Sequence, residues 1–487
     1  MSASPRSPLV EELVPLPDPV RCCELLKGLP HRLFLDSASR DRRLGRYSYV
    51  MADPVAVVRS GASGQDPLAA VRDALAPFAA EPVPGLPPFQ GGAAGYIAYD
   101  WGLALERLPA PVYDDLALDD VALGIYPWVL AWDHLQSRAW LISTGMPEAA
   151  PAAAARRALE RARAIRGLLD GDSPAGSVRL DANRESPATA GQHASNRRAP
   201  SYRIEHGWWD PRIELESSFT RTGYLNAVER VRTYIFAGDI FQANLSQRFE
   251  TPLREPPWSL YCRLRDRNPA PFAAFLDFPD VAILSASPER FLRVDTAGHV
   301  ETRPIKGTRP RGIGPEHDAA LAQALAESAK DRAENLMIVD LMRNDLSRVC
   351  APGTVRVDQL FALEQYATVH HLVSTVVGQL APGADAFDVL RAAFPGGSIT
   401  GAPKLRAMEI IAELEPSRRG VYCGSIGYWS VTGELDTSIA IRTAVVRDGR
   451  VYFNAGGGVV ADSSPADEYQ ETLDKARGLI DALAVPD

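Results

Sequence analysis

The 487-residue sequence predicts an α+β fold in which strands and helices alternate along the chain. Over residues 1–165, strand-like stretches such as 92–99 alternate with proline-rich turns and helical segments. An alanine- and arginine-rich helix is predicted over about 147–169. From about residue 218 to the end, strands and helices alternate again at higher density. We therefore expect one large catalytic unit, with the N-terminal third folded against the rest.

A polar segment separates these two parts of the chain. From about residue 170 to 201 the sequence consists of Gly, Ser, Asp, Asn, Arg and Pro, with almost no large apolar residues. Such a segment cannot bury enough apolar surface to order itself. The sequence thus predicts an N-terminal region (1–169), a flexible linker (170–215) and a catalytic region (216–487).

The composition excludes several classes of protein. The net charge is −9, so there is no basic surface of the kind that binds nucleic acid. No apolar run approaches the roughly 18 residues that cross a bilayer, and the N-terminus lacks the pattern of a signal peptide. The five cysteines are scattered without a Cys-x-x-Cys pair, which indicates reduced thiols. We expect a cytoplasmic enzyme that binds neither nucleic acid nor membrane.

The segment around Glu334 contains a carboxylate on an apolar helical face. At helical spacing, Glu334 shares that face with Met337, Ile338 and Leu341. An unpaired charge pointing inward is costly, so this group must meet a cation, be protonated or border a wet cleft. A structural Arg or Lys partner and a functional site both remain open at this point.

The C-terminal helix is predicted to begin at Ser464, with Pro465 in its first turn. Glu468, Glu471 and Lys475 fall within about 60° of arc on this helix. Two glutamates at i and i+3 are plausible ligands for Mg²⁺, and Lys475 could contact an anion held by that metal. A solvated ion-pair face is the alternative interpretation.

Two glycine-rich segments and one lysine complete the candidate site. Residues 394–404 end in a helix start, where free N–H groups suit an anion. Three consecutive glycines at 456–458 let the backbone approach a ligand closely, although turns and strand crossings also explain such triplets. Lys306, between β-branched and glycine residues, need not face solvent; a surface strand lysine is the alternative.

Taken together, these segments resemble the chorismate-utilising enzyme family, which contains component I of anthranilate synthase and of aminodeoxychorismate synthase, isochorismate synthases and salicylate synthases. The resemblance runs from about residue 220 to 483 and is carried, in family order, by motifs such as SASPERF, PIKGTRPRG, VHHLVSTVVG, FPGGSITGAPK, NAGGGVVADS and EYQETLDKA. It implies a fold of two large antiparallel β-sheets that form a core flanked by helices.

The resemblance also implies roles for individual residues. Glu334, Glu468 and Glu471 would hold Mg²⁺ against a carboxylate of chorismate. The substrate carboxylates would be contacted by Tyr422, Arg442, Gly457, Gly458 and Lys475, with Thr400 lining the same pocket. Glu289 would be the general acid that protonates the departing C4 hydroxyl, with His371 hydrogen-bonding near it. Gln242 occupies the family's position for a base that deprotonates water; because glutamine cannot do so, isochorismate and salicylate synthesis are disfavoured.

Lys306 distinguishes the two remaining activities. Anthranilate synthases generally have a small residue at this position, whereas a lysine can attack C2, expel the C4 hydroxyl by an allylic shift and then be displaced as ammonia enters at C4. We therefore expect amination of chorismate to 4-amino-4-deoxychorismate, on the route to p-aminobenzoate and folate, via a covalent lysine intermediate. The alternatives are anthranilate synthesis and a non-catalytic subunit that senses chorismate or tryptophan.

Two further expectations concern partners and regulation. The chain has no cysteine nucleophile in a glycine-rich elbow, so we expect ammonia from a separate glutamine amidotransferase subunit, component II, as in the family. Related enzymes carry a tryptophan pocket in the N-terminal third, which corresponds here to Asp36, Ser37, Arg46 and Ser48. Asp36 stands where the family often has the longer Glu, which favours a vestigial, purely structural pocket.

Overall fold

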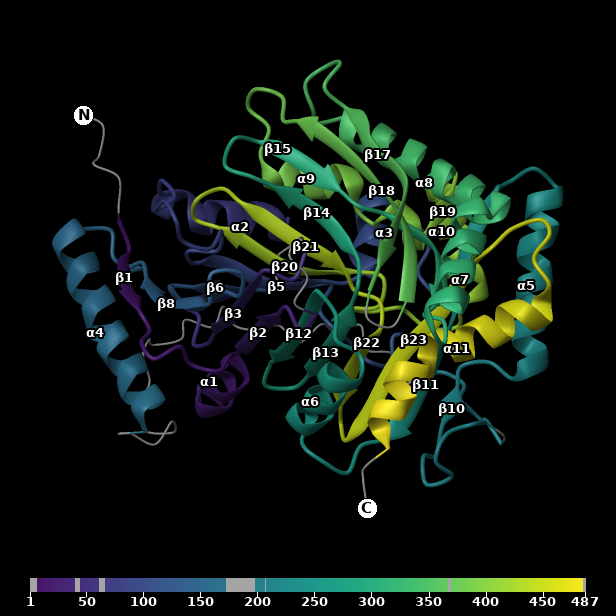
Figure 1. Cartoon of the computed structure of the whole chain (residues 1–487), viewed down its shortest axis with the longest axis horizontal. Helices are drawn as coiled ribbons and strands as arrows, with labels where there is room; N and C mark the ends of the chain where they lie inside the picture. The colour runs from purple at the N-terminus through teal and green to yellow at the C-terminus, as the bar shows by residue number, and fades with distance from the viewer. Residues whose placement is uncertain are drawn as a thin grey trace.

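The structure, a computed structural model, describes residues 7–39, 44–60, 66–171, 198–205, 207–366 and 369–484. Their strands form two antiparallel sheets, and helices surround these sheets (Figure 1). The predicted α+β fold with two large antiparallel sheets is confirmed.

The larger sheet contains 13 strands among the described residues. In spatial order they are β1 (Leu9–Glu12), β8 (Arg138–Ser143), β7 (Trp128–Asp133), β3 (Tyr47–Met51), β2 (Arg32–Asp36), β12 (Phe272–Asp277), β13 (Ala282–Ser287), β22 (Thr443–Arg447), β23 (Arg450–Val459), β11 (Gln242–Pro252), β10 (Glu216–Ser217) and β9 (Tyr202–Arg203), with β19 (Gly401–Ala402) pairing with β11.

The smaller sheet contains 10 strands in the same part of the chain. In spatial order they are β16 (Ile305–Pro310), β18 (Val369–Gln379), β15 (His299–Thr302), β14 (Arg290–Val294), β21 (Leu435–Ile439), β20 (Ser425–Ser430), β5 (Gly92–Ile97), β6 (Val121–Tyr126) and β4 (Ala56–Arg59), with β17 (Arg356–Gln365) pairing with β18.

The N-terminal and C-terminal regions share both sheets. In the larger sheet β2 pairs with β12, so that Phe34 lies opposite Phe275. In the smaller sheet β5 pairs with β20, with Gly95 opposite Gly427. The N-terminal third therefore contributes strands to the same two sheets as the catalytic region. We expected it only to pack against that region.

The predicted linker is too long at its C-terminal end. Residues 172–197 and 206 lie outside the described residues. The described part from residue 198 to 215 contains β9, and Leu215 is buried. Ile204, Trp209 and Ile213 pack against the same core. These large apolar side chains explain why this part joins the fold.

The core has three layers of apolar contacts. Between the sheets, Tyr49 of the larger sheet packs with Tyr428 of the smaller one. The helices that contribute to the core outside the larger sheet are α1 (Pro19–Leu25), α4 (Pro151–Asp170), α6 (Pro257–Arg267) and α11 (Pro465–Leu483). Those that contribute to the core outside the smaller sheet include α2 (Pro67–Leu75), α3 (Asp100–Glu106), α8 (Ala329–Ser347), α9 (Ala386–Ala393) and α10 (Lys404–Leu414).

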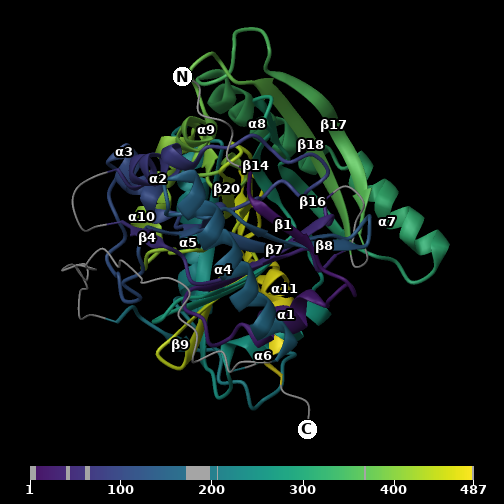
Figure 2. The ribbon, with the colours of Figure 1, turned by 90° about the vertical axis from the view of Figure 1, so that its left-hand side faces the viewer.

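Two helices lie at the periphery. Helix α5 (Arg221–Phe236) packs with β11 and α10 around a separate apolar cluster. Helix α7 (Pro315–Glu327) lies beside β16 and β17 at the edge of the molecule (Figure 2). Short 3₁₀ turns occur at Ala76–Phe78 (η1) and Gly397–Ile399 (η3).

The helices that carry the candidate site begin close to the predicted positions. Helix α11 starts at Pro465 after Ser464, as predicted. Helix α10 starts at Lys404, with Pro403 as its N-cap, one residue later than expected. Among the described residues no helix combines the length and apolar character needed to cross a bilayer. The five cysteines, all within the described ranges, are free thiols.

Candidate active site

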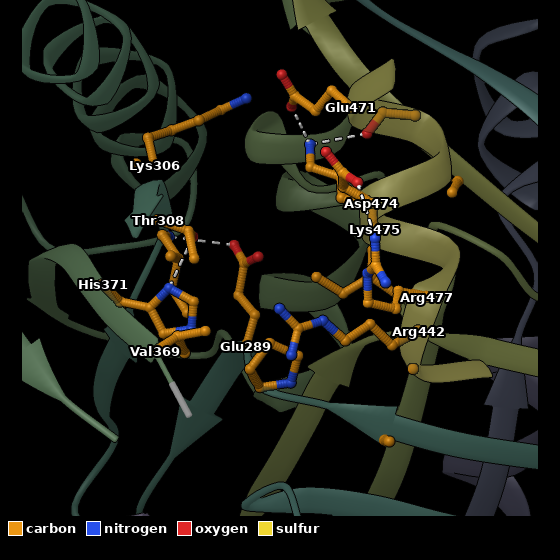
Figure 3. A pocket seen from close by; sticks show the side chains of 18 of the residues that line it. Glu289, Lys306, Thr308, Val369, His371, Arg442, Glu471, Asp474, Lys475 and Arg477 are labelled. Atoms are coloured by element: carbon orange, nitrogen blue, oxygen red, sulfur yellow. Dashed lines mark hydrogen bonds and ion pairs between the residues drawn. The ribbon is translucent and has the colours of Figure 1, made fainter. Parts of the chain in front are cut away.

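A cavity of about 1250 Å³ contains most of the predicted site residues (Figure 3). The predicted residues that line it are Glu289, Lys306, Glu334, His371, Tyr422, Arg442, Gly458, Glu468, Glu471 and Lys475. Thr400 and Gly457 are not among the lining residues.

Three carboxylates enter the cavity from two helices. Glu334 comes from α8, and Glu468 and Glu471 come from consecutive turns of α11. Burial raises the pKa of both Glu334 and Glu468. Burial also acts on Glu471, but the positive charges of Lys475 and other lysines outweigh it and leave the pKa of Glu471 below its usual value.

The carboxylates of Glu468 and Glu471 meet beside Gly457. A Cβ on Gly457 would lie 3.0 Å from Oε2 of Glu468 and 3.0 Å from Oε1 of Glu471. Oε1 of Glu468 accepts a hydrogen bond of 2.6 Å from the Ser463 hydroxyl, whereas its Oε2 is buried without a partner. Buried oxygens without a donor are unusual and indicate a missing ligand or water.

These residues fit a divalent cation that prefers oxygen ligands. The donors are carboxylate oxygens, which suit Mg²⁺, and one of them is a buried oxygen that lacks a partner. In the described ranges, no three His, Cys, Asp or Glu side chains already stand in the arrangement of a metal site. Glu471 instead pairs with Lys475, at 2.6 Å between Oε1 and Nζ.

Glu289 is a buried acid between β13 and β14. Its Oε1 accepts hydrogen bonds from the Ser398 hydroxyl at 2.7 Å and from the Ile305 N–H at 3.4 Å. Burial raises the pKa of Glu289 to about 7, although these hydrogen bonds and the charge of Lys306 oppose the shift. A large fraction of Glu289 is therefore protonated at neutral pH, as a general acid requires.

His371 has the opposite protonation preference. Its Nδ1 lies 2.9 Å from the Thr308 hydroxyl, across the pairing of β16 with β18. Burial and the nearby Arg442 charge lower the pKa of His371 to about 3. The imidazole is thus neutral at physiological pH, so it can hydrogen-bond, but its remaining N–H is too weak an acid to protonate a leaving hydroxyl. Of the two, Glu289 is the better placed acid.

Arg442 and Lys306 bring positive charge to the cavity. Within the described residues, neither side chain makes a hydrogen bond or ion pair to a carboxylate at contact distance. Burial lowers the pKa of Arg442. A guanidinium without a partner in a half-buried site suits a carboxylate, which it can bind through two parallel hydrogen bonds. Figure 3 shows the Lys306 amine and the Glu289 carboxyl group pointing into the same space.

The glycine triplet of β23 is required by close packing. A Cβ on Gly456 would lie 2.4 Å from the Leu245 carbonyl oxygen, and one on Gly458 would lie 1.8 Å from Nε2 of Gln242. The same position on Gly458 is 3.3 Å from Nζ of Lys306. Larger residues would therefore displace the groups that line the cavity.

Thr400 is placed differently from the prediction. Its side chain is fully buried, and its hydroxyl donates to the Gly396 carbonyl oxygen at 3.1 Å. The neighbouring Ser398 lines the cavity instead. The 3₁₀ turn η3 ends just before Thr400 and directs its side chain back into the loop.

Sequence reasoning also missed Asn244, which lines the cavity from β11. Its Nδ2 is buried without a partner, which makes it a further donor for a bound molecule. The signal was present in the sequence, because Asn244 follows Gln242 by two residues and alternate residues of a strand share a face.

The residues predicted for an N-terminal ligand pocket lie in a separate cavity of about 200 Å³. Asp36, Ser37 and Arg46 line it, whereas Ser48 is fully buried and does not. Arg46 pairs with Asp133 at 2.7 Å.

The carboxylate of Asp36 in this second cavity already has partners within the protein. Oδ2 of Asp36 accepts from Nε of Arg265 at 2.6 Å and from the Tyr261 hydroxyl at 3.2 Å, and Oδ1 accepts from the Ser48 hydroxyl at 3.2 Å. An amino group would have to displace Arg265 to reach this carboxylate, which favours a structural role for the pocket.

Comparisons with known proteins agree with one another. The sequence profile of a family described as chorismate binding enzyme matches residues 30–481. Aminodeoxychorismate synthase component 1 of Salmonella typhimurium is 43% identical over 470 residues, covering 93% of each chain. Anthranilate synthase component 1 of Streptomyces coelicolor is 42% identical over 453 residues, covering 92% of this chain and 83% of that protein. The crystal structure of anthranilate synthase component I from Streptococcus pneumoniae superposes with a TM-score of 0.71 at 31% identity, covering 89% of this chain and 92% of that one.

Proposed function

We propose, because the chain belongs to the chorismate binding enzyme family, that it aminates chorismate at C4 with ammonia to give 4-amino-4-deoxychorismate. This is the reaction expected of component I of an aminodeoxychorismate synthase, and three relatives of that name are 41–43% identical over more than nine tenths of the chain. The observation that carries the proposal is that the Lys306 amine and the protonatable Glu289 line the same cavity.

Substrate binding would use the cations that have no partner among the described residues. Arg442 would hold one carboxylate of chorismate in bidentate fashion, and Tyr422 and the backbone at Gly458 would border the same group. Glu334, Glu468 and Glu471 would hold Mg²⁺, which when bound would neutralise and polarise a substrate carboxylate. Lys475 would keep Glu471 oriented and add positive charge.

The chemistry would proceed in two displacements. After the Lys306 ammonium has lost a proton to solvent, its neutral amine forms a bond to C2, the ring double bond shifts, and the C4–O bond breaks as Glu289 donates its proton, so that the hydroxyl leaves as water. Ammonia then forms a bond to C4, the double bond shifts back and the C2–N bond to Lys306 breaks. The two protons shed by the attacking nitrogens return to Lys306 and Glu289, so the balance is chorismate plus ammonia to product plus water.

Ammonia would come from a glutamine amidotransferase subunit, component II, in the cytoplasm. The described cysteines are buried or half-buried, and burial raises the pKa of Cys22 to about 12 and of Cys262 to about 11. Thiols in this state are poor nucleophiles for glutamine hydrolysis. The single chain should therefore use ammonium salts and ignore glutamine.

Anthranilate synthesis is the second candidate, since relatives of that name are nearly as similar. The deciding experiment incubates the pure chain with chorismate and Mg²⁺, with either ammonium chloride or glutamine, and identifies products by mass spectrometry. We expect 4-amino-4-deoxychorismate, with the pyruvyl group retained, from ammonium alone. Anthranilate and free pyruvate would replace the proposal with the second candidate, and activity with glutamine would remove the need for a partner.

A further inference from the structure

The structure assigns a role to Ser398 beyond lining the cavity: we infer that its hydroxyl is the positioning group that orients Glu289, so that Oε2 presents the transferable proton to the substrate. This inference rests on the proposed function, in which Glu289 is the general acid. Ser398 belongs to the FPGGSITGAPK motif, in which the resemblance assigned a role to Thr400 but none to Ser398.

The hydrogen bonds of Glu289 distinguish its two oxygens. Oε1 accepts from both the Ser398 hydroxyl and the Ile305 N–H. Oε2 makes no hydrogen bond to any group in the described part of the chain and faces the cavity (Figure 3). Moving the proton to Oε1 would set it against the N–H donor of Ile305, so the neutral acid keeps its proton on Oε2.

The loop around Ser398 is held from three sides, which fixes the direction of its hydroxyl. Lys404 donates to the Ala393 carbonyl oxygen at 2.9 Å and pairs with Asp345 of α8 at 2.6 Å. Arg419 donates to the Ile399 carbonyl oxygen at 3.1 Å.

The third anchor comes from β11, where the Asn244 N–H donates to the Thr400 carbonyl oxygen at 2.7 Å. Ser398 itself is only 9% exposed. A side chain held on such a scaffold loses little entropy on orienting its neighbour, as a positioning group requires.

Other charged groups also face Glu289. Lys306 of β16 and Lys475 of α11 act on it through charge, and Arg442 and His371 border the same space. Cys423 lies close enough to feel the charge of Glu289, but burial raises the pKa of its thiol to about 12, so it stays neutral. A change confined to Ser398 leaves all these groups in place.

The test compares Ser398→Ala with Ser398→Thr, which keeps a hydroxyl. Loss of the donor should raise the pKa of Glu289, so the alkaline limb of kcat/KM should move up by about one pH unit in the alanine variant. Its kcat should fall about tenfold while KM for chorismate stays within twofold, because orientation of the acid matters only in the transition state. The threonine variant should restore both values.

A second measurement separates this inference from the proposed function. In protein labelled with ¹³C at glutamate carboxyl groups, the Glu289 signal is identified by its loss in Glu289→Gln and titrated without substrate. A shift of that titration in Ser398→Ala supports the inference whatever the product of the enzyme is. An unmoved titration and alkaline limb, or a loss of kcat that threonine does not rescue, would overturn it.

Discussion

Glu471 and Lys475 face each other one helical turn apart on α11, with 2.6 Å between Oε1 and Nζ. Lys475 also donates to the Gly456 carbonyl oxygen at 2.8 Å, which ties the helix to the glycine strand β23. This contact favours the ionised form of Glu471 beside the half-buried Glu334 and the buried Glu468, whose pKa values are raised. A negatively charged oxygen cluster of this kind needs a cation to be stable.

The metal proposal predicts that Glu471→Gln abolishes turnover without unfolding the protein. The substitution keeps size but removes the charge that Mg²⁺ requires. Calorimetry should show loss of Mg²⁺ binding, and the melting temperature should stay within a few degrees. Asp467→Asn, at an exposed position of the same helix, is the matched control and should bind Mg²⁺ normally. Unchanged Mg²⁺ affinity and rate in Glu471→Gln would remove Glu471 from the site.

The covalent mechanism predicts a chorismate-derived mass addition on the wild-type chain when ammonia is withheld. Lys306→Ala should lack this addition and keep Mg²⁺ and chorismate binding, because the three glutamates and Arg442 remain. Its residual product should shift towards substitution at C2, since ammonia or water can reach the vacated face. Intact-protein mass spectrometry and product analysis measure both effects.

Lys330→Ala provides the control for this experiment, because Lys330 lines the same cavity. It should retain the adduct. If the wild type shows no adduct and Lys306→Ala still makes 4-amino-4-deoxychorismate, Lys306 is only an electrostatic contact. In that case its loss would mainly raise KM.

The acid role of Glu289 predicts a pH limit on activity. Because its pKa is raised to about 7 and the protonated form is needed, kcat/KM should fall about tenfold per pH unit above that value. Glu289→Gln should lose most of the activity at every pH. A rate that stays constant from pH 6 to 9 would assign the proton transfer to another group.

The same burial predicts a cost in stability. The folded pKa of Glu289 lies above its ordinary value of 4.5, so the wild type loses stability as the pH rises from about 4.5 to about 7. Glu289→Gln avoids this loss and should unfold with a free energy higher by up to about 3 kcal/mol at pH 8.5. Denaturant unfolding at pH 4.5 and 8.5 should show a difference between the two proteins only at the higher pH.

The N-terminal cavity is predicted to bind tryptophan weakly or not at all. Arg265 already forms an ion pair with the Asp36 carboxylate, and Asp133 forms one with Arg46. Calorimetry with tryptophan should therefore give no measurable heat at micromolar concentrations. Tight binding accompanied by slower turnover would instead establish feedback control through this pocket.

The parts of the site that sequence predicted well are those with a regular period. Helical spacing places Glu468, Glu471 and Lys475 on one face, and the structure brings all three to the cavity. The loop before α10 has no such period, so the motif alone could not show that Ser398, and not Thr400, faces the cavity. That choice depends on how η3 turns.

Local sequence patterns also cannot predict which strands pair with one another. The pairing of β2 with β12 joins Phe34 to Phe275, residues far apart in sequence, and no periodicity specifies such a partner. Likewise the polar composition extends only to about residue 201, whereas the predicted linker runs to residue 215. The large apolar residues that follow, such as Leu215, contribute to the core.

The sharing of both sheets has a consequence for how this protein can be divided. If the gene were split between residues 171 and 198, each fragment would expose the hydrogen-bonding edge of two interrupted sheets, at β2 and β5 on one piece and at β12 and β20 on the other. Such exposed strand edges promote aggregation, so neither fragment should fold into an active form alone. When both fragments are produced in one cell, each should supply the pairing strands that the other lacks, so that the two fold together. The recovered enzyme activity would then measure assembly of the sheets.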